Sequence, residues 1–216
     1  MKAVLPMLIF ALPLFLPFLF STLLPEDAEG YDRVTGRMDA SRSDVIAEHG
    51  MVCAAQPLAV QIGVDILKKG GSAVDAAIAV NAALGLMEPV SCGIGGDLFA
   101  IVWDAKSKRL YGLNASGRAP KLLTIEEVRG KGHNRIPYTG VLPQTVPGCV
   151  DGWFELHERF GRLSMQDILS PALHYAEEGF PVTEVIAFYW DLGGRRLKDE
   201  PNFASTYLPE GRAPRK

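Results

Sequence analysis

The segment from Gly50 to Pro120 constrains the fold more than any other part of the chain, because it holds signals for two helices, a turn and a β-hairpin in direct succession. Residues 51–55 at its start predict a short buried strand. Pro57 is tolerated in the first turn of a helix, and Gly70-Gly71 can end that helix, because glycine adopts a left-handed C-terminal cap without a Cβ clash. We therefore expect a strand followed directly by a helix.

A second helix is predicted immediately after that glycine pair. Ser72 and Asp75 stand three residues apart, the spacing of a capping box that satisfies the first backbone N–H groups of a helix. The following residues, 73–88, are dense in alanine and apolar on most faces, which is typical of a helix buried between layers. Pro89 ends the helix. This helix is expected to pack in the core.

A glycine-rich turn and a hairpin complete the segment. Residues 97–103 form an apolar run, 104–108 a polar turn and 109–113 a second strand, and the first strand is expected to be covered on both faces. The glycines of the turn Ser91–Asp97 permit positive φ angles and close backbone approach. This turn follows a helix and opens a strand, the reverse of a phosphate-binding loop, so nucleotide binding is not expected.

Helices predominate in the rest of the chain. An amphipathic stripe predicts a helix from Val150 to Phe160, Ser164 and Ser170 are each expected to begin a further helix, and a last helix is expected over 183–192. In the helix expected after Ser170, Pro171 would take the first position. The order of strand, helix, helix, hairpin and helices favours an α/β (α+β) fold, with helices packed on a mainly antiparallel sheet.

Charge and cysteine content exclude several function classes. The formal net charge of −3 and the scattered basic residues provide no footprint for nucleic acid. The three cysteines form no CxxC pair and have no histidine neighbours at zinc spacing, so they are expected to be small buried side chains. No metal or other cofactor is expected.

The first 49 residues are interpreted separately from the fold. Residues 1–24 are apolar after Lys2 and predict a signal peptide or signal anchor, although three prolines interrupt the run and no clear cleavage site follows. Residues 25–49 are polar and read as a linker, so the domain is expected over 50–216. The protein is then expected to be periplasmic or secreted, with or without a membrane anchor, or cytoplasmic if the leader is spurious.

The best candidate for binding chemistry is the segment Asn114–Pro120, which follows the second strand of the hairpin. A loop just past a strand end can present side chains to a cleft. The guanidinium of Arg118 suits a substrate α-carboxylate, because its planar fork binds both oxygens. The alternative is a surface arginine in a simple salt bridge. No catalytic residue is identified within the chain.

Several motifs together resemble the start of the large subunit of γ-glutamyltransferases (glutathione hydrolases), in a divergent bacterial-type branch. Ser91–Asp97 matches the family's SxGIGGGGF segment, with Asp97 and Leu98 in place of two glycines, and Pro147–Trp153 resembles its PGTVAGF segment. In the family an arginine four residues before an Ala-Pro proline binds the γ-glutamyl α-carboxylate. That position is Ser116 here, so the role either shifts to Arg118 or is altered.

This resemblance implies part of an N-terminal-nucleophile hydrolase with a four-layer α-β-β-α sandwich. It implies a precursor (zymogen) that cleaves itself into a large and a small subunit. The N-terminal threonine of the small subunit then cleaves γ-glutamyl amides such as glutathione and passes the acyl group to water or an amino acid. The chain ends at Lys216, before any segment that could supply that threonine. We therefore expect an N-terminal fragment, inactive without its own small subunit and poorly soluble because its sheet lacks partner strands.

Two other interpretations of the function are considered. One is an acylase or amidase of the same superfamily acting on non-glutamyl amides, suggested by the departure at Ser116 and Arg118. The other is a non-catalytic domain tethered to a membrane through residues 1–24, suggested by the apolar leader and the missing nucleophile.

Overall fold

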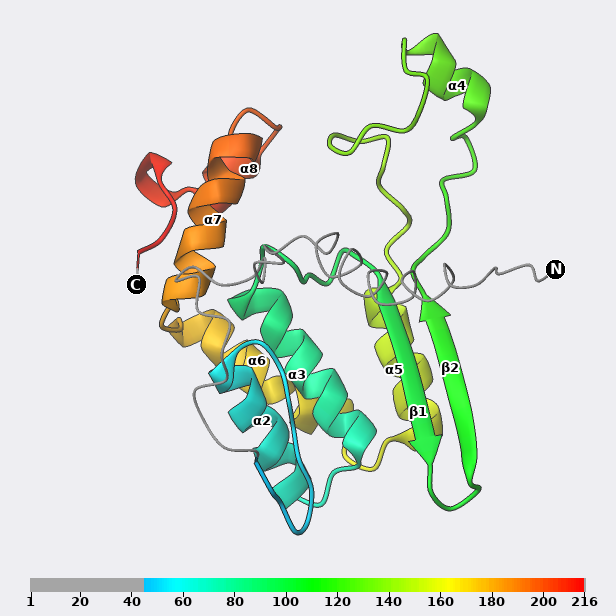
Figure 1. Ribbon diagram of the computed structural model, residues 1–216, viewed down its shortest axis with the longest axis vertical. Coiled ribbons are helices and arrows are strands. Elements are labelled where there is room, and N and C mark those ends of the chain that lie inside the picture. Colours follow the sequence, from blue (N-terminus) through cyan, green and yellow to red (C-terminus); the bar gives the residue numbers. More distant parts are fainter. Residues whose placement is uncertain (1–44, 216) are drawn as a thin grey trace, which may run out of the picture. The chain divides into compact units, whose positions relative to one another are not determined.

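The computed structural model describes residues 45–215, so the predicted leader over 1–24 and most of the predicted linker over 25–49 lie outside the described residues. Figure 1 shows the helices of this part of the chain and the β-hairpin, which lies at one side of them. In chain order the elements are α2 (Pro57–Lys68), α3 (Ala73–Met87), β1 (Leu98–Asp104), β2 (Arg109–Ala115), α4 (Ile125–Gly130), α5 (Cys149–Phe160), α6 (Met165–Glu178), α7 (Glu184–Leu197), α8 (Phe203–Tyr207) and a 3-10 turn η1 (Pro209–Gly211).

Helix α2 begins and ends where the sequence predicts. The side chain of Gln56 accepts a hydrogen bond of 3.0 Å from the Ala59 N–H, and Pro57 occupies the first helical position. Gly70 follows the helix with φ of +90°, the left-handed conformation expected of a C-terminal glycine. The strand predicted over 51–55 is wrong, since that segment has no strand partner among residues 45–215.

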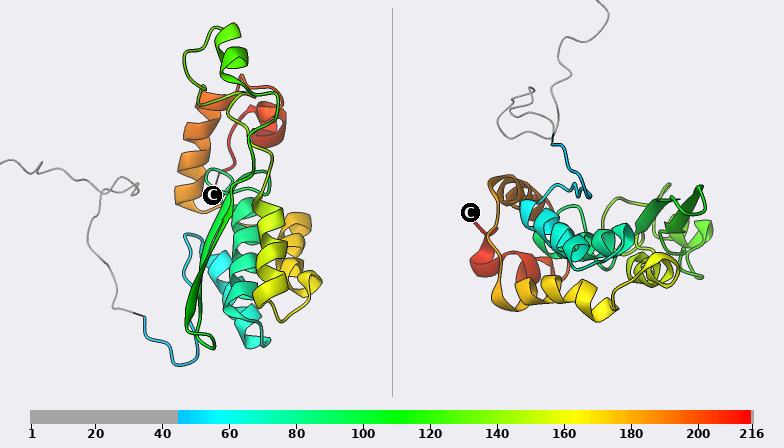
Figure 2. Two further views of the ribbon diagram at one scale, coloured as in Figure 1. Left: turned by 90° about the vertical axis from the view of Figure 1, so that its right-hand side faces the viewer. Right: turned by 90° about the horizontal axis from the view of Figure 1, so that it is seen from below.

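Helix α3 is the central element of the core, as its alanine-rich sequence predicts. Its capping box is present, with reciprocal hydrogen bonds between Ser72 and Asp75. Helices α2, α5 and α6 all pack against it (Figures 1 and 2). Small side chains such as Ala79 and Ala83 are fully buried and allow this close approach of helices.

The hairpin is confirmed, but the prediction that its first strand is covered on both faces is wrong. Strands β1 and β2 pair antiparallel from Leu98 opposite Ala115 to Asp104 opposite Arg109. Alternate residues of β1, such as Val102, pack toward the core and α5. The intervening apolar side chains are exposed, namely Phe99 (67%), Ile101 (78%) and Trp103 (61%). Helix α5 covers one face of the hairpin, and the described chain places no element over the other.

We expect the 216-residue chain expressed alone to associate through this exposed apolar face. Replacing Ile101 and Trp103 together with threonine should raise the monomer fraction in size-exclusion chromatography, because threonine suits a strand while removing apolar area. The control Val102→Thr acts on the packed face and should lower the melting temperature without relieving association. A wild-type chain that is monodisperse and melts cooperatively would contradict this prediction.

Helix α6 corrects the prediction of two separate helices after Ser164. Ser164 caps the helix as expected, but the helix continues through Pro171 to Glu178. Proline has no N–H to donate to the carbonyl four residues earlier, which here belongs to Asp167. The Ser170 hydroxyl donates to that Asp167 carbonyl at 3.1 Å instead. The serine therefore replaces the missing backbone bond, and the helix is not interrupted.

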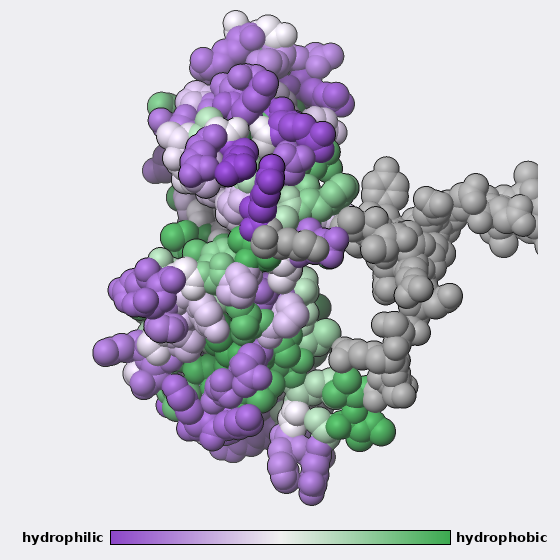
Figure 3. Space-filling view, turned by 90° about the vertical axis from the view of Figure 1, so that its left-hand side faces the viewer, coloured by the Kyte–Doolittle hydropathy of each residue, from purple (hydrophilic) through white to green (hydrophobic). Residues whose placement is uncertain are grey.

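A groove lies beside the segment that was predicted to be a strand. It has a volume of about 410 Å³ and is lined mainly by apolar residues of 51–54 and of α3, with Leu67 of α2. In Figure 3 apolar residues gather in the lower half of the molecule, the part that contains α2, α3 and α6. None of the helices within residues 45–215 is both long and apolar enough to cross a bilayer.

Candidate functional site

Three segments that are far apart in sequence meet at one end of the hairpin. They are the glycine-rich turn Ser91–Asp97, the segment Ser116–Pro120 after β2, and the residues Thr145–Gly148 before α5. The carbonyl of Gly96 accepts hydrogen bonds from the N–H groups of Gly148 at 3.2 Å and Cys149 at 3.1 Å. These two bonds join the turn directly to the start of α5.

The segment that carries Arg118 is held by the residues before α5. The Val146 N–H donates to the Arg118 carbonyl at 2.9 Å, and the Thr145 hydroxyl donates to the Ser116 carbonyl at 3.2 Å. Between these bonds Gly117 has a φ of +84°, and a Cβ at this position would stand 1.8 Å from the Val146 carbonyl oxygen. Only glycine allows the two backbones to come so close. The backbone of Arg118 is therefore fixed.

The side chain of Arg118 is exposed and has no ion pair or hydrogen bond within the described part of the chain. The alternative interpretation, a surface arginine in a simple salt bridge, is therefore not supported, because no acidic residue of the described chain pairs with Arg118. Ser116 is half-buried, its N–H donates to the Asn114 side chain at 3.1 Å, and its hydroxyl lies 3.5 Å from the Gly117 carbonyl. The substrate-binding roles predicted for Arg118 and Ser116 stay predictions, and the arrangement leaves the guanidinium free to bind an anion.

Two polar residues of this region were not predicted to take part. The Thr145 hydroxyl lies 3.4 Å from Oδ1 of Asp97 as well as 3.2 Å from the Ser116 carbonyl, so it bridges the glycine-rich turn and the Arg118 segment. Asp97 is exposed and interacts with no cation in residues 45–215. The only feature of the sequence that marks Asp97 is that the resembled family has glycine at this position.

The glycines of the turn play a different role from the one predicted. None of Gly93, Gly95 and Gly96 takes a φ in the left-handed region, so positive φ does not explain them. Close approach does not explain them either, since a Cβ at Gly96 would stand 3.5 Å from the Gly93 carbonyl oxygen and no atom lies within 4 Å of a Cβ at Gly93 or Gly95. The Gly96 carbonyl contributes more directly, because it anchors the start of α5.

The cysteines near the site are not activated thiols. Burial raises the pKa of the Cys149 thiol, and the nearby Cys92 and Asp97 raise it further. The pKa of Cys92 is likewise raised by burial and by Glu88. A raised pKa keeps each thiol protonated, whereas the thiolate is the nucleophile. The prediction that all three cysteines are buried holds for Cys149 and is wrong for Cys53, which is exposed, and for Cys92, which is half-buried.

Asn81 and Trp153 tie α3 to α5 beneath the site. Asn81 is half-buried, and its side-chain oxygen accepts a hydrogen bond of 2.8 Å from the Trp153 indole N–H. Gly152 brings α5 close to the hairpin, since a Cβ there would meet the Ala115 Cβ at 2.7 Å. Over residues 45–215 no three side chains of His, Cys, Asp or Glu gather in a way that could hold a metal ion.

Comparisons with known proteins identify the family. The family model for Gamma-glutamyltranspeptidase matches residues 59–216. The chain is 39% identical to the glutathione hydrolase-like YwrD proenzyme of Bacillus subtilis over 79% of its own length and 32% of that relative. It resembles the crystal structure of cephalosporin acylase from Bacillus halodurans at 44% identity and a TM-score of 0.71, covering 83% of this chain and 36% of that one.

A third likeness is to the gamma-glutamyltranspeptidase from Pseudomonas nitroreducens, at 32% identity and a TM-score of 0.68, covering 75% of this chain and 49% of that one. These likenesses confirm the predicted fold class, an α/β portion of an N-terminal-nucleophile hydrolase. The chain spans about a third of the length of the YwrD relative. The family is one of enzymes, and by its sequence and its fold this chain belongs to the gamma-glutamyltranspeptidase family.

Proposed function

We propose that the chain is the N-terminal part of the large subunit of a γ-glutamyltransferase (glutathione hydrolase), in which Arg118 binds the α-carboxylate of the γ-glutamyl donor. The observation that carries this proposal is the exposed, unpaired guanidinium of Arg118 on a backbone fixed by Val146 and Gly117. A guanidinium presented by a fixed backbone can bind a carboxylate with two parallel hydrogen bonds.

In the proposed reaction the nucleophile comes from the small subunit and not from this chain. The hydroxyl oxygen of its N-terminal threonine attacks the γ-carbonyl carbon, and the threonine's own amine accepts the hydroxyl proton. The amide C–N bond then breaks, the leaving amine takes up that proton, and an ester-linked acyl-enzyme remains. The oxygen of water or the nitrogen of an amino acid amine attacks this ester and loses a proton to the threonine amine. The acyl C–O bond then breaks, the threonine oxygen takes up that proton, and the γ-glutamyl product is released. The donor's α-carboxylate stays on Arg118 throughout, which holds the γ-carbonyl at the nucleophile.

Replacing Arg118 with alanine in the full-length protein is expected to raise KM for γ-glutamyl-p-nitroanilide by about 10- to 100-fold, since a hydrogen bond to a charged group contributes about 1.5–3 kcal/mol. Arg118→Lys should recover only part of this loss, because lysine lacks the planar fork. Arg129→Ala removes an exposed arginine from α4 and serves as the matched control. Unchanged kinetics in Arg118→Ala would refute the proposed role.

The second candidate function is an acylase acting on non-glutamyl amides, which the 44% identity to the cephalosporin acylase favours. The two candidates differ in the donor that the full-length protein accepts. A γ-glutamyltransferase hydrolyses γ-glutamyl-p-nitroanilide, whereas an acylase of this kind should leave it untouched and cleave an amide without the α-amino group. Membership of an enzyme family speaks against the third reading, a non-catalytic tethered domain.

A further inference from the structure

We propose that the turn end of the β-hairpin docks on the surface of a membrane that contains anionic phospholipids. This basic tip consists of Lys106 and Lys108 in the turn, Arg109 at the start of β2 and Arg159 of α5. Membrane docking here does not depend on the proposed function, because the basic tip lies at the opposite end of the hairpin from Arg118.

The register of the hairpin gathers three of the four cations around one turn. Asp104, the last residue of β1, pairs with Arg109, the first residue of β2, so Lys106 and Lys108 lie in the turn between them. The side chains of all four cations are exposed. Figure 1 shows this turn at the lower end of the hairpin, where α5 also ends. The cations therefore lie together at one end of the hairpin.

Arg109 and Arg159 meet at one aromatic ring. The guanidinium carbon of Arg159 lies 4.0 Å from the centre of the Tyr111 ring, and that of Arg109 lies 5.7 Å from it. Hydrogen bonding with the Ser107 hydroxyl lowers the pKa of the Tyr111 hydroxyl, and the two arginines lower it further. These cation–π contacts hold the two guanidiniums in place without neutralising their charge.

The charge of the basic tip is not neutralised within the described chain, where none of its four cations forms an ion pair. The Asp104 carboxylate accepts hydrogen bonds from the N–H groups of Lys106 at 3.1 Å and Ser107 at 3.2 Å, so it closes the turn. Glu155 lines the same small cavity as Arg159 but makes no ion pair with it. The four cations outnumber these two carboxylates, although the chain has a formal net charge of −3. An anionic surface is complementary to this tip.

Exposed apolar residues beside the turn favour a lipid surface over a soluble anion. Trp103 and Leu110 form the second cross-strand pair from the turn, and they are 61% and 64% exposed. Tryptophan is enriched at the level of the lipid headgroups, and lysine and arginine are attracted to anionic headgroups. A tryptophan and several cations at one end of a protein are the combination that binding in the membrane interface uses.

Docking through the basic tip leaves the candidate site accessible. Each strand of the hairpin has seven residues, which corresponds to a length of about 20 Å. The segment that carries Arg118 follows the other end of β2. A membrane that contacts the turn therefore lies about 20 Å from the start of this segment, and a soluble donor can still reach it.

The test measures binding of the full-length protein, at low salt, to sedimenting vesicles of phosphatidylcholine alone and of equal parts of phosphatidylcholine and phosphatidylglycerol. The ratio of the two partition coefficients reports charge, because an apolar contact contributes to both alike. We expect the wild type to prefer the anionic vesicles and the double variant Lys106→Gln, Lys108→Asn to lower the ratio by about tenfold or more. Asparagine suits position 108, where φ is +54°.

The control Arg129→Gln, Lys131→Gln removes two charges at the same spacing from α4 and its C-terminal cap, beyond the other end of the hairpin (Figures 1 and 2). This variant should keep the ratio within about twofold, because attraction to the membrane falls off within a Debye length. High salt should abolish the preference of the wild type for the anionic vesicles.

A wild-type ratio near one, or an unchanged ratio in the Lys106/Lys108 variant, would overturn the proposed docking. Release of the bound protein by glycerol phosphate, but not by chloride at the same ionic strength, would indicate a site for a soluble phosphate and would also overturn it. The hydrolysis of γ-glutamyl-p-nitroanilide tests the proposed function separately, so the two can fail independently.

Discussion

Replacing Asp75 with alanine is expected to lower the free energy of unfolding by about 3 kcal/mol or more, a large share of the roughly 5–15 kcal/mol typical of a folded domain. Asp75 is completely buried, with 0% of its surface exposed. Its Oδ2 accepts hydrogen bonds from the N–H groups of Ser72 at 2.8 Å, Arg162 at 3.0 Å and Leu163 at 3.2 Å. Alanine would leave all three donors without an acceptor.

The reason for so large an effect is that this one carboxylate joins two parts of the core. It caps the N-terminus of α3, where the helix dipole favours a negative charge, and it also holds the connection between α5 and α6. Asp75→Asn is expected to be intermediate, because the amide has one acceptor oxygen and would turn its NH₂ group toward backbone donors. Urea unfolding of the full-length protein, followed by circular dichroism, measures both variants.

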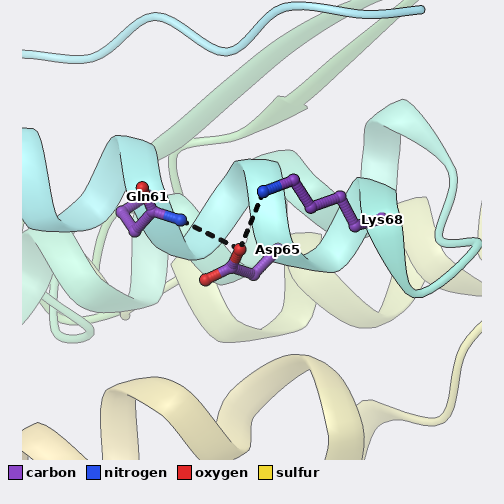
Figure 4. A network of polar contacts seen from close by, with 3 residues as sticks. All are labelled: Gln61, Asp65 and Lys68. Carbon is purple, nitrogen blue, oxygen red and sulfur yellow. Dashed lines mark hydrogen bonds and ion pairs between the residues drawn. The ribbon is translucent and has the colours of Figure 1, made fainter.

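Asp65 provides the matched control on the neighbouring helix α2. Its carboxylate accepts a hydrogen bond from Gln61 Nε2 at 2.9 Å and lies 3.7 Å from Lys68 Nζ, all on the exposed face of the helix (Figure 4). Exposed contacts of this kind contribute about 0.5 kcal/mol or less, so Asp65→Ala should be nearly neutral. If the two alanine variants unfolded at the same urea concentration, the structural role assigned to Asp75 would be wrong.

The parts of the fold that depend on near neighbours could be predicted from the sequence. The capping box of α3 spans three residues, and the hairpin needs only two short strands around a polar turn. The contacts of Asp75 with Arg162, 87 positions away, carry no local signal. A run of apolar residues predicts a strand that is covered on both faces, but it does not indicate which segment covers each face. One face of β1 is exposed in the described chain, so the prediction from the apolar run is wrong for that face.

The candidate site could also be predicted only in part from the sequence. The position of Arg118 just after a strand predicts a loop, and the structure places the residue in a loop that follows β2. Ligand binding by this loop stays a prediction. The residues that hold this loop were not predicted, because Thr145 contacts Ser116 and Asp97 across 29 and 48 positions. A threonine in a loop has no pattern that distinguishes a bridging hydroxyl from a solvated one. Such contacts depend on how α5 packs against the hairpin, which only the folded chain determines.

Gly117→Ala is expected to raise KM for γ-glutamyl-p-nitroanilide by about tenfold or more in the full-length protein and to lower the melting temperature. An alanine with φ near +84° pays about 1–2 kcal/mol for the left-handed conformation. Its Cβ would also stand 1.8 Å from the Val146 carbonyl oxygen, and backbone cannot move aside as a flexible side chain can. The hydrogen bond between the Val146 N–H and the Arg118 carbonyl must then open, and the backbone that presents the guanidinium is displaced.

The contribution of that close contact can be separated from backbone strain by Gly140→Ala. Gly140 has a φ of +87°, nearly that of Gly117, but no atom lies within 4 Å of its Cβ position. The control therefore carries the conformational cost alone and should lower the melting temperature modestly while KM stays at its wild-type value. If Gly117→Ala behaved like Gly140→Ala in both measurements, the contact between the Arg118 segment and Val146 would not position the substrate.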